Sequence, residues 1–171
     1  MKLKIFAAFA ATIMVTASCG ILGGAASNAG TAGAASKATG IGAALAGIYT
    51  QYKTDGKLDL TNLTTIINIA SVLNDLKGIK GATTNALQSA DFVNGLISGS
   101  KNLVNQANSA SIVSGLTTLA GLDLSSITNA ANKINKGTEE AAQAAVGKIN
   151  TTSDQMTTAI NALSGIMKAF K

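Results

Sequence analysis

The sequence predicts an all-α protein, an up-and-down helical bundle of about five or six helices that follows a flexible Gly/Ala-rich tether. Among its 171 residues there is no proline to break a helix. Apolar residues recur at steps of three and four, which is the spacing of one face of an α-helix. Glycines and an Asp-Gly pair separate these segments, as expected for helix ends and turns. The length indicates one domain with a core that needs neither a disulfide nor a metal.

The clearest break in the chain is residues 53–60, which contain the turn pair Asp55-Gly56. A first helix is expected over residues 37–52, and Asp59 or Thr61 is expected to cap the next one. That second helix is predicted to end at Lys77-Gly78 and to bury a face that consists of Leu63, Ile66, Ile67, Ala70 and Leu73.

Three further helices are predicted in the middle of the chain. The first covers residues 83–97, the second covers residues 101–120 and can break near Ser109, and the third covers residues 125–135 after the turn at Gly121–Leu124. In the first of them, the residues expected to point inward are Ala86, Ala90, Val93 and Ile97.

One long last helix is expected from Thr138, with Glu139 and Glu140 at its positive end. It has two interpretations: a core helix of an antiparallel bundle, or a coiled-coil seam that would make the protein a homo-oligomer. The small and polar residues early in the seam favour the core helix. The apolar positions, over four heptads, are Ala142, Ala145, Ile149, Thr152, Met156, Ala159, Leu163, Ile166 and Phe170.

Two short segments resemble each other at a spacing of 64 residues: LDLTNL at 58–63 and LDLSSI at 122–127. Each is expected to lead into a helix, so the pair indicates either a duplicated helical hairpin or two similar caps that arose separately.

Composition excludes several classes of function. All 13 basic residues are lysines, there are 8 acids, and histidine is absent. Without arginine, and with scattered lysines and few aromatic residues, a nucleic-acid partner is not expected. Without histidine or convergent carboxylates, no catalytic residues, no metal ligands and no cofactor are assigned. The sequence therefore favours a protein that is not an enzyme.

The N-terminal sequence predicts an export signal. Lys2 and Lys4 precede an apolar run at residues 5–15 that is too short to span a bilayer, and small residues lead to Cys19, the single cysteine. Val15-Thr16-Ala17-Ser18-Cys19 resembles the lipobox of bacterial lipoproteins, with Thr16 where that family usually carries a large aliphatic residue. The resemblance covers about 20 residues and is informative on location, not on activity.

The lipobox resemblance implies that residues 1–18 are removed and that Cys19 is linked to diacylglycerol and acylated at its amine. Two or more acyl chains hold a protein stably on a membrane. Because Gly20 and not Asp follows Cys19, the resemblance implies the outer membrane, facing the periplasm. Residues 19–36 would then be the tether and residues 37–171 the helical domain. Residues 20–47 have an alternative interpretation as a glycine-zipper membrane segment.

Residues 51–62 also resemble an EF-hand calcium loop, through Asp55, Gly56 and Asp59. Gln51 and Lys53 stand where carboxylates belong, so a helix–turn–helix with a capping aspartate is the favoured interpretation.

After these exclusions two functions are favoured over a third, a membrane-active or calcium-responsive module. The first is a non-catalytic cell-envelope lipoprotein that acts as a structural or protein-interaction module, with an envelope protein as partner. The alternative is a binder of a small apolar ligand or lipid, held between Ala- and Gly-lined helices.

Overall fold

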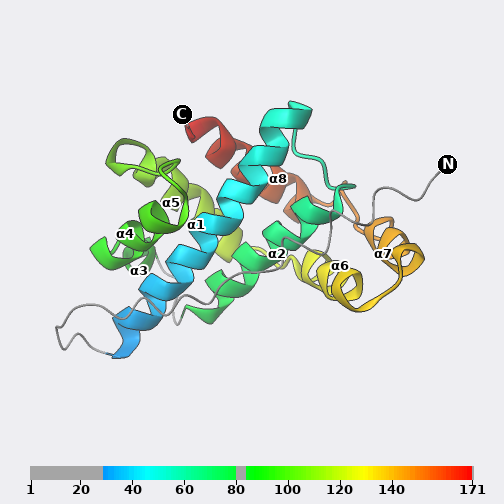
Figure 1. The fold of residues 1–171 in the computed structure, drawn as a ribbon, viewed down its shortest axis with the longest axis horizontal. Helices are drawn as coiled ribbons and strands as arrows, with labels where there is room; N and C mark the ends of the chain where they lie inside the picture. The colour runs from blue at the N-terminus through cyan, green and yellow to red at the C-terminus, as the bar shows by residue number, and fades with distance from the viewer. Residues whose placement is uncertain (1–28, 80–83, 171) are drawn as a thin grey trace.

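The computed structural model describes residues 29–79 and 84–170, and these residues form helices and no strand (Figure 1). The all-α prediction is confirmed for this part of the chain. Its eight helices are α1 (Ala29–Asp55), α2 (Leu63–Gly78), α3 (Thr84–Leu87), α4 (Ala90–Gly99), α5 (Gln106–Ala120), α6 (Ser125–Lys136), α7 (Glu139–Val146) and α8 (Asp154–Ala169).

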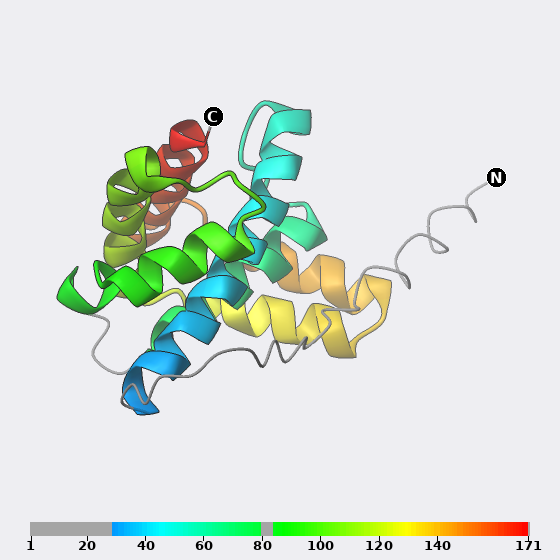
Figure 2. The same ribbon diagram turned by 60° about the vertical axis from the view of Figure 1, so that its left-hand side comes forward.

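Helix α1 crosses the molecule (Figures 1 and 2). It packs on α2 and α4, while α5 packs on α8, and α6 packs on both α2 and α7. One apolar core joins these pairs. Its largest fully buried side chains are Phe92, Ile41, Leu45, Ile48, Ile66, Ile69, Leu76, Leu87, Leu96, Ile112, Leu116 and Leu119.

Glycines bring α1 and α4 into contact along their backbones. A Cβ atom added to Gly95 would lie 2.6 Å from the Ala35 carbonyl oxygen, and one added to Gly99 would overlap the peptide group of Thr39. From the other side, a Cβ on Gly42 would lie 2.6 Å from the carbonyl oxygen of Leu96. Only glycine fits at these points, so the two helices approach more closely than side chains would allow.

The first helix begins earlier than expected. Residues 29–36, assigned to the tether, belong to α1, which also extends past residue 52 to Asp55. Alanine favours the helix, and from Ala35 onward the backbone lies against α4. Gly42, within the segment interpreted alternatively as a glycine zipper, lies against the backbone of α4. The remainder of the predicted tether, residues 19–28, lies outside the described residues.

Helix α2 differs from the prediction at its cap and over part of its buried face. Ile66, Ala70 and Leu73 are buried as predicted, whereas Leu63 and Ile67 are only partly buried. Its N-cap is Asn62, whose Oδ1 accepts hydrogen bonds from the backbone N–H groups of Thr64 at 2.9 Å and Thr65 at 3.2 Å. The expected caps, Asp59 and Thr61, bond to each other instead and shape the preceding loop. The helix ends at Gly78, as predicted.

The helix predicted over residues 83–97 is interrupted at Ser89. Ser89 is the N-cap of α4 and its Oγ accepts a hydrogen bond from the backbone N–H of Phe92 at 3.3 Å. This new start changes which face is buried: Phe92 and Leu96 are fully enclosed. The predicted inward set is right only in part: Val93 and Ile97 pack against the core but stay partly exposed, and Ala90 is exposed.

The helix predicted over residues 101–120 begins only at Gln106, and Ser109 lies within it. Lys101 and Asn102 adopt left-handed backbone conformations with φ of 54° and 72°, which end the preceding helix. Asn105 and Asn108 then form a reciprocal capping box at the start of α5.

The prediction of a single last helix is also wrong, because this segment is divided into α7 and α8. Gly147 ends α7, and Asn150 accepts hydrogen bonds from the backbone N–H and the hydroxyl of Thr152 at 3.1 and 2.8 Å. Ser153 then caps α8. Short polar side chains that bond to the nearby backbone compete with helix continuation.

The apolar positions of the predicted seam are nevertheless covered by the chain's own helices. All except Thr152 are buried, with α7 against α6 and α8 against α5. The end of α8 is held by an edge-to-face contact of Phe170 with Tyr49 at a centroid distance of 5.2 Å. The side-chain amide of Asn108 also donates to the Ala169 carbonyl at 3.1 Å. These residues therefore serve a core inside one chain.

The two similar segments, 58–63 and 122–127, have similar local structures. Asp59 Oδ1 accepts from the backbone N–H of Thr61 at 2.8 Å, and Asp123 Oδ1 accepts from that of Ser125 at 3.1 Å. The helices that follow, α2 and α6, pack on each other. The two serine N-caps Ser89 and Ser153 repeat the same spacing of 64 residues. Duplication of a helical hairpin stays a prediction that these correspondences favour.

We predict that Gly99→Ala destabilises the protein by about 1–3 kcal/mol, because the added methyl group forces α1 and α4 apart. Gly33→Ala is the matched control, since no described residue lies within 4 Å of its Cβ position, and it should stabilise helix α1 by about 0.5–1 kcal/mol. Urea unfolding followed by circular dichroism measures both. Equal stabilities of the two variants would contradict the close backbone contact.

We predict that a substitution at Thr65 stabilises the protein. Thr65 is only 1% exposed, and its hydroxyl has no hydrogen-bond partner among the residues that the structure describes. Thr65→Val removes this hydroxyl while keeping the shape, so we expect a gain of about 1 kcal/mol in the free energy of unfolding. Thr157→Val, at an exposed position of α8, should change it by less than about 0.5 kcal/mol. A loss of stability in Thr65→Val would show that the hydroxyl is satisfied.

Candidate functional site

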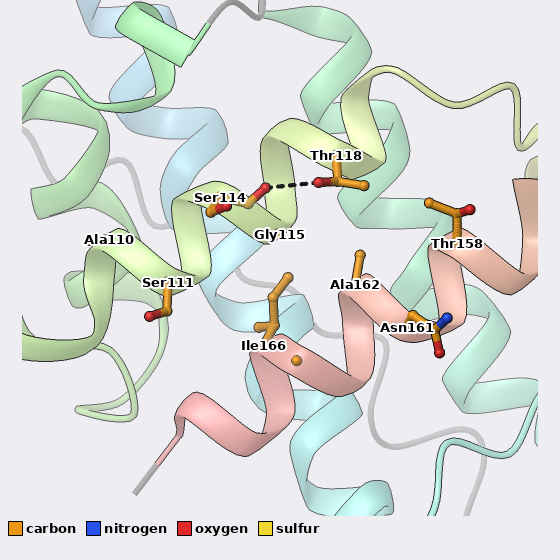
Figure 3. Close-up of a pocket in the computed structure, with 10 residues that line it drawn as sticks. Ala110, Ser111, Ser114, Gly115, Thr118, Thr158, Asn161, Ala162 and Ile166 are labelled. Carbon is orange, nitrogen blue, oxygen red and sulfur yellow. Dashed lines mark hydrogen bonds between the residues drawn. The ribbon is translucent and has the colours of Figure 1, made fainter.

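A groove of about 680 Å³ lies between α5 and α8 (Figure 3). It is open to solvent, with Ile166 and Ala162 of α8 facing Gly115 of α5. The complete lining is Ala110, Ser111, Ser114, Gly115, Thr118, Thr158, Asn161, Ala162, Gly165 and Ile166.

Small residues explain why α8 fits here. A Cβ atom on Gly115 would lie 2.6 Å from Ile166 Cγ1, so the absent side chain gives Ile166 its place. Along α5, Ala110, Ser114 and Thr118 recur every fourth residue and so share one face. The Thr118 hydroxyl donates to the Ser114 carbonyl at 3.1 Å and is satisfied within α5 (Figure 3).

A second open groove of about 400 Å³ lies on the other side of α5, next to α4. Ala110 lines both grooves, so the outward face of α5 is the ridge between them. The lining combines amide, hydroxyl and apolar side chains: Gln88, Ala90, Val93, Asn94, Gln106, Ser109, Ala110 and Val113.

Both grooves are lined by hydroxyl, amide and apolar side chains. None of the lining residues is charged, so the hydroxyl groups of Ser111, Ser114 and Thr158 have no lining base to activate them. Hydroxyl and amide groups both donate and accept hydrogen bonds, which suits contact with a polar surface or a backbone.

A different kind of contact joins α1 and α2 at their polar edge. The Lys37 ammonium lies 3.8 Å from the Asp75 carboxylate, and both side chains are about one-third exposed. Two glycines make room for this pair: a Cβ on Gly40 would lie 2.6 Å from Asp75 Oδ2, and one on Gly78 would overlap the Lys37 side chain. Burial raises the pKa of Asp75, and the nearby charge of Lys37 offsets this only in part.

The pKa values of the aspartates in the two similar loops are shifted in the opposite direction, downward. Hydrogen bonds from the Thr61 hydroxyl and backbone lower the pKa of Asp59, and those from Ser125 lower the pKa of Asp123. In the segment that resembles a calcium loop, Asn62 donates through its side-chain amide to Gln51 at 3.3 Å. These groups close the loop between α1 and α2.

The predicted lipidation site, Cys19, lies outside the described residues. Within residues 29–79 and 84–170, no three residues of the His, Cys, Asp and Glu types gather to hold a metal ion. None of the helices in these ranges is long and apolar enough to cross a membrane alone; α5 and α6 reach that length only together, with a bend of 90° between them.

No protein-family model, curated protein or solved structure matches this chain. The grooves beside α5 were not anticipated from the sequence. The signal that could have indicated them is the recurrence of small residues every fourth position, at Ala110, Ser114 and Thr118 and at Thr158 and Ala162.

The opposite pKa shifts of Asp75 and Asp59 predict opposite effects of pH on the free energy of unfolding. The pKa of Asp75 is raised in the folded protein. Its contribution to the free energy of unfolding is therefore present below the unfolded-state pKa of about 3.8 and is lost as the pH rises through the folded-state pKa. Because the pKa of Asp59 is lowered, its contribution is present above about 3.8 and is lost as the pH falls.

We therefore expect Asp75→Asn to gain stability relative to the wild type as the pH rises from 3 to 6, and Asp59→Asn to lose stability over the same range. Urea unfolding at several pH values measures both differences. Differences of the same sign in the two variants would contradict the assigned causes.

Proposed function

We propose that this protein is a lipid-anchored, non-catalytic protein of the cell envelope, held in the outer membrane and facing the periplasm. Its helical domain would serve as a structural or protein-interaction module. The observation that carries this proposal is the sequence Val15-Thr16-Ala17-Ser18-Cys19 at the end of an apolar export segment. A single cysteine in an exported chain is left without a partner for a disulfide, and lipidation would account for it.

The described domain supports a role in contact between proteins. The chain has no histidine, and both grooves beside α5 are uncharged and lined by residues that suit binding. The alternative, a binder of a small apolar ligand, has less support. Such a ligand is typically enclosed on most sides, whereas both grooves are open to solvent.

Fractionation of cells that express the wild type or Cys19→Ala tests the anchor. We expect the wild type in the outer-membrane fraction, with an intact mass that shows cleavage before Cys19 and added acyl chains. Cys19→Ala should be released or left unprocessed, because two or more chains are needed for stable anchoring. Ser27→Ala, a substitution of similar size eight residues later, should behave like the wild type.

A soluble wild type without acyl mass would contradict the proposal. The protein would then be a secreted helical protein, and Cys19 would be incidental.

A further inference from the structure

The exposed face of α5 carries no charge, unlike the other helices that the structure describes. Every other described helix of 8 residues or more contains at least one lysine, aspartate or glutamate, whereas α5 contains none in its 15 residues. Helix faces turned to solvent usually carry charged side chains. The neutral face consists of the exposed residues Gln106, Ala107, Ala110, Ser111, Ser114 and Thr118.

Two hydroxyl groups on this face are available to a partner. Ser109, Thr117 and Thr118 donate to carbonyl oxygens of the preceding turn of α5, at 3.1, 2.9 and 3.1 Å. Ser111 and Ser114 make no side-chain hydrogen bond to any described residue, and both line the groove between α5 and α8 (Figure 3). Because a hydroxyl group both donates and accepts, a surface of this kind can bond to an identical copy of itself.

The shape of the face is also complementary to itself. Ala110, Ser114 and Thr118 form a ridge of small side chains, and the open groove of about 680 Å³ lies on its α8 side. A ridge of one helix packs into a groove of another. With a two-fold axis beside Ser114, the ridge of each copy enters the α5–α8 groove of the other, and the two contacts are equivalent.

The absence of charge favours a second copy over a partner that is recognised by its charge. In a two-fold contact the groups near the axis meet their own copies, so a lysine there would meet a lysine and be repelled. The chain has 13 lysines and 8 acids, yet none of them lies on α5 or lines either groove. The face therefore avoids repulsion of its own copy and offers no counter-charge to an acidic or basic protein.

The size of the face indicates how strong the contact is. Helix α5 is about 22 Å long for its 15 residues, and α5 and α8 side by side are about 20 Å wide. Both copies together would cover roughly 900 Å², which is below the area of about 1,200–2,000 Å² that stable interfaces bury. A contact of this size is reversible.

We infer that the partner of this face is a second copy of the chain, and that the ridge on α5 of each copy packs in the α5–α8 groove of the other. The result is a reversible dimer with two-fold symmetry. This inference rests on the proposed role as a protein-interaction module and names the partner for that role. It holds with or without the lipid anchor.

Thiol crosslinking at Ser114 tests the symmetric contact. Cells that express full-length Ser114→Cys are treated with a short bismaleimide, which spans the distance of about 8–10 Å between packed helices. We expect several-fold more crosslinked homodimer than from Ser71→Cys, a control at an exposed serine in the middle of α2. A lipidated Cys19 has no free thiol, and an unmodified Cys19 would react equally in both variants.

Sedimentation measures the strength of the same contact in the wild type, Ser114→Lys and Ser71→Lys, from about 1 μM to about 0.5 mM protein. We expect the wild-type dimer fraction to rise with concentration. Ser114→Lys should raise the dissociation constant about tenfold or more, because two lysines then meet at the axis, while Ser71→Lys should match the wild type. Circular dichroism shows whether each variant is folded.

A wild type that stays monomeric overturns the inference, as does a dimer that Ser114→Lys leaves unchanged. Crosslinking of Ser114→Cys to a different protein, with no homodimer above the Ser71→Cys control, also overturns it. Intact mass reports the acyl chains independently. A protein without acyl mass therefore contradicts the lipid anchor and leaves the test of the dimer in place.

Discussion

The backbone contact between α1 and α4 is the constraint on which the rest of the structure depends. At Gly42, Gly95 and Gly99 the peptide groups of the two helices lie so close that no Cβ fits between them. Such contacts maximise dispersion between backbones and leave no void. Because α1 packs on both α2 and α4, its position in the core determines where these two helices lie.

The opposite face of α1 is adapted in the same way, but to polar groups. Gly40 gives room to Asp75, and a Cβ on Gly47 would lie 2.5 Å from the Asn68 side-chain amide. A helix that contacts neighbours on both faces has no wide solvent face, and accordingly α1 shows no clear division into polar and apolar sides. Its place in the centre therefore comes from tertiary packing and not from its own amphipathic pattern.

This explains which parts of the fold the sequence predicts. The breaks at Gly56 and Gly121 are predicted because glycine and aspartate mark them directly. The start of α1 is missed because Ala, Gly and Ser in residues 29–36 suit a tether until α4 is placed beside them. The break between α7 and α8 is missed because Ile149, inside it, is buried and continues the three-and-four spacing. Periodicity records burial, and a buried loop residue satisfies it as well as a helix does.

The grooves beside α5 follow from the same use of small residues at the surface. Gly115 admits Ile166, which brings α8 against α5 and leaves shallow, uncharged hollows on the outside. Small residues thus close the interface of α1 and α4 but leave the face of α5 open. The hydroxyl and amide groups of these hollows lose bound water when a second surface covers them, so that surface must supply hydrogen bonds in return. Under the proposed lipid anchor, partners held in the same membrane layer would meet this face at a raised effective concentration.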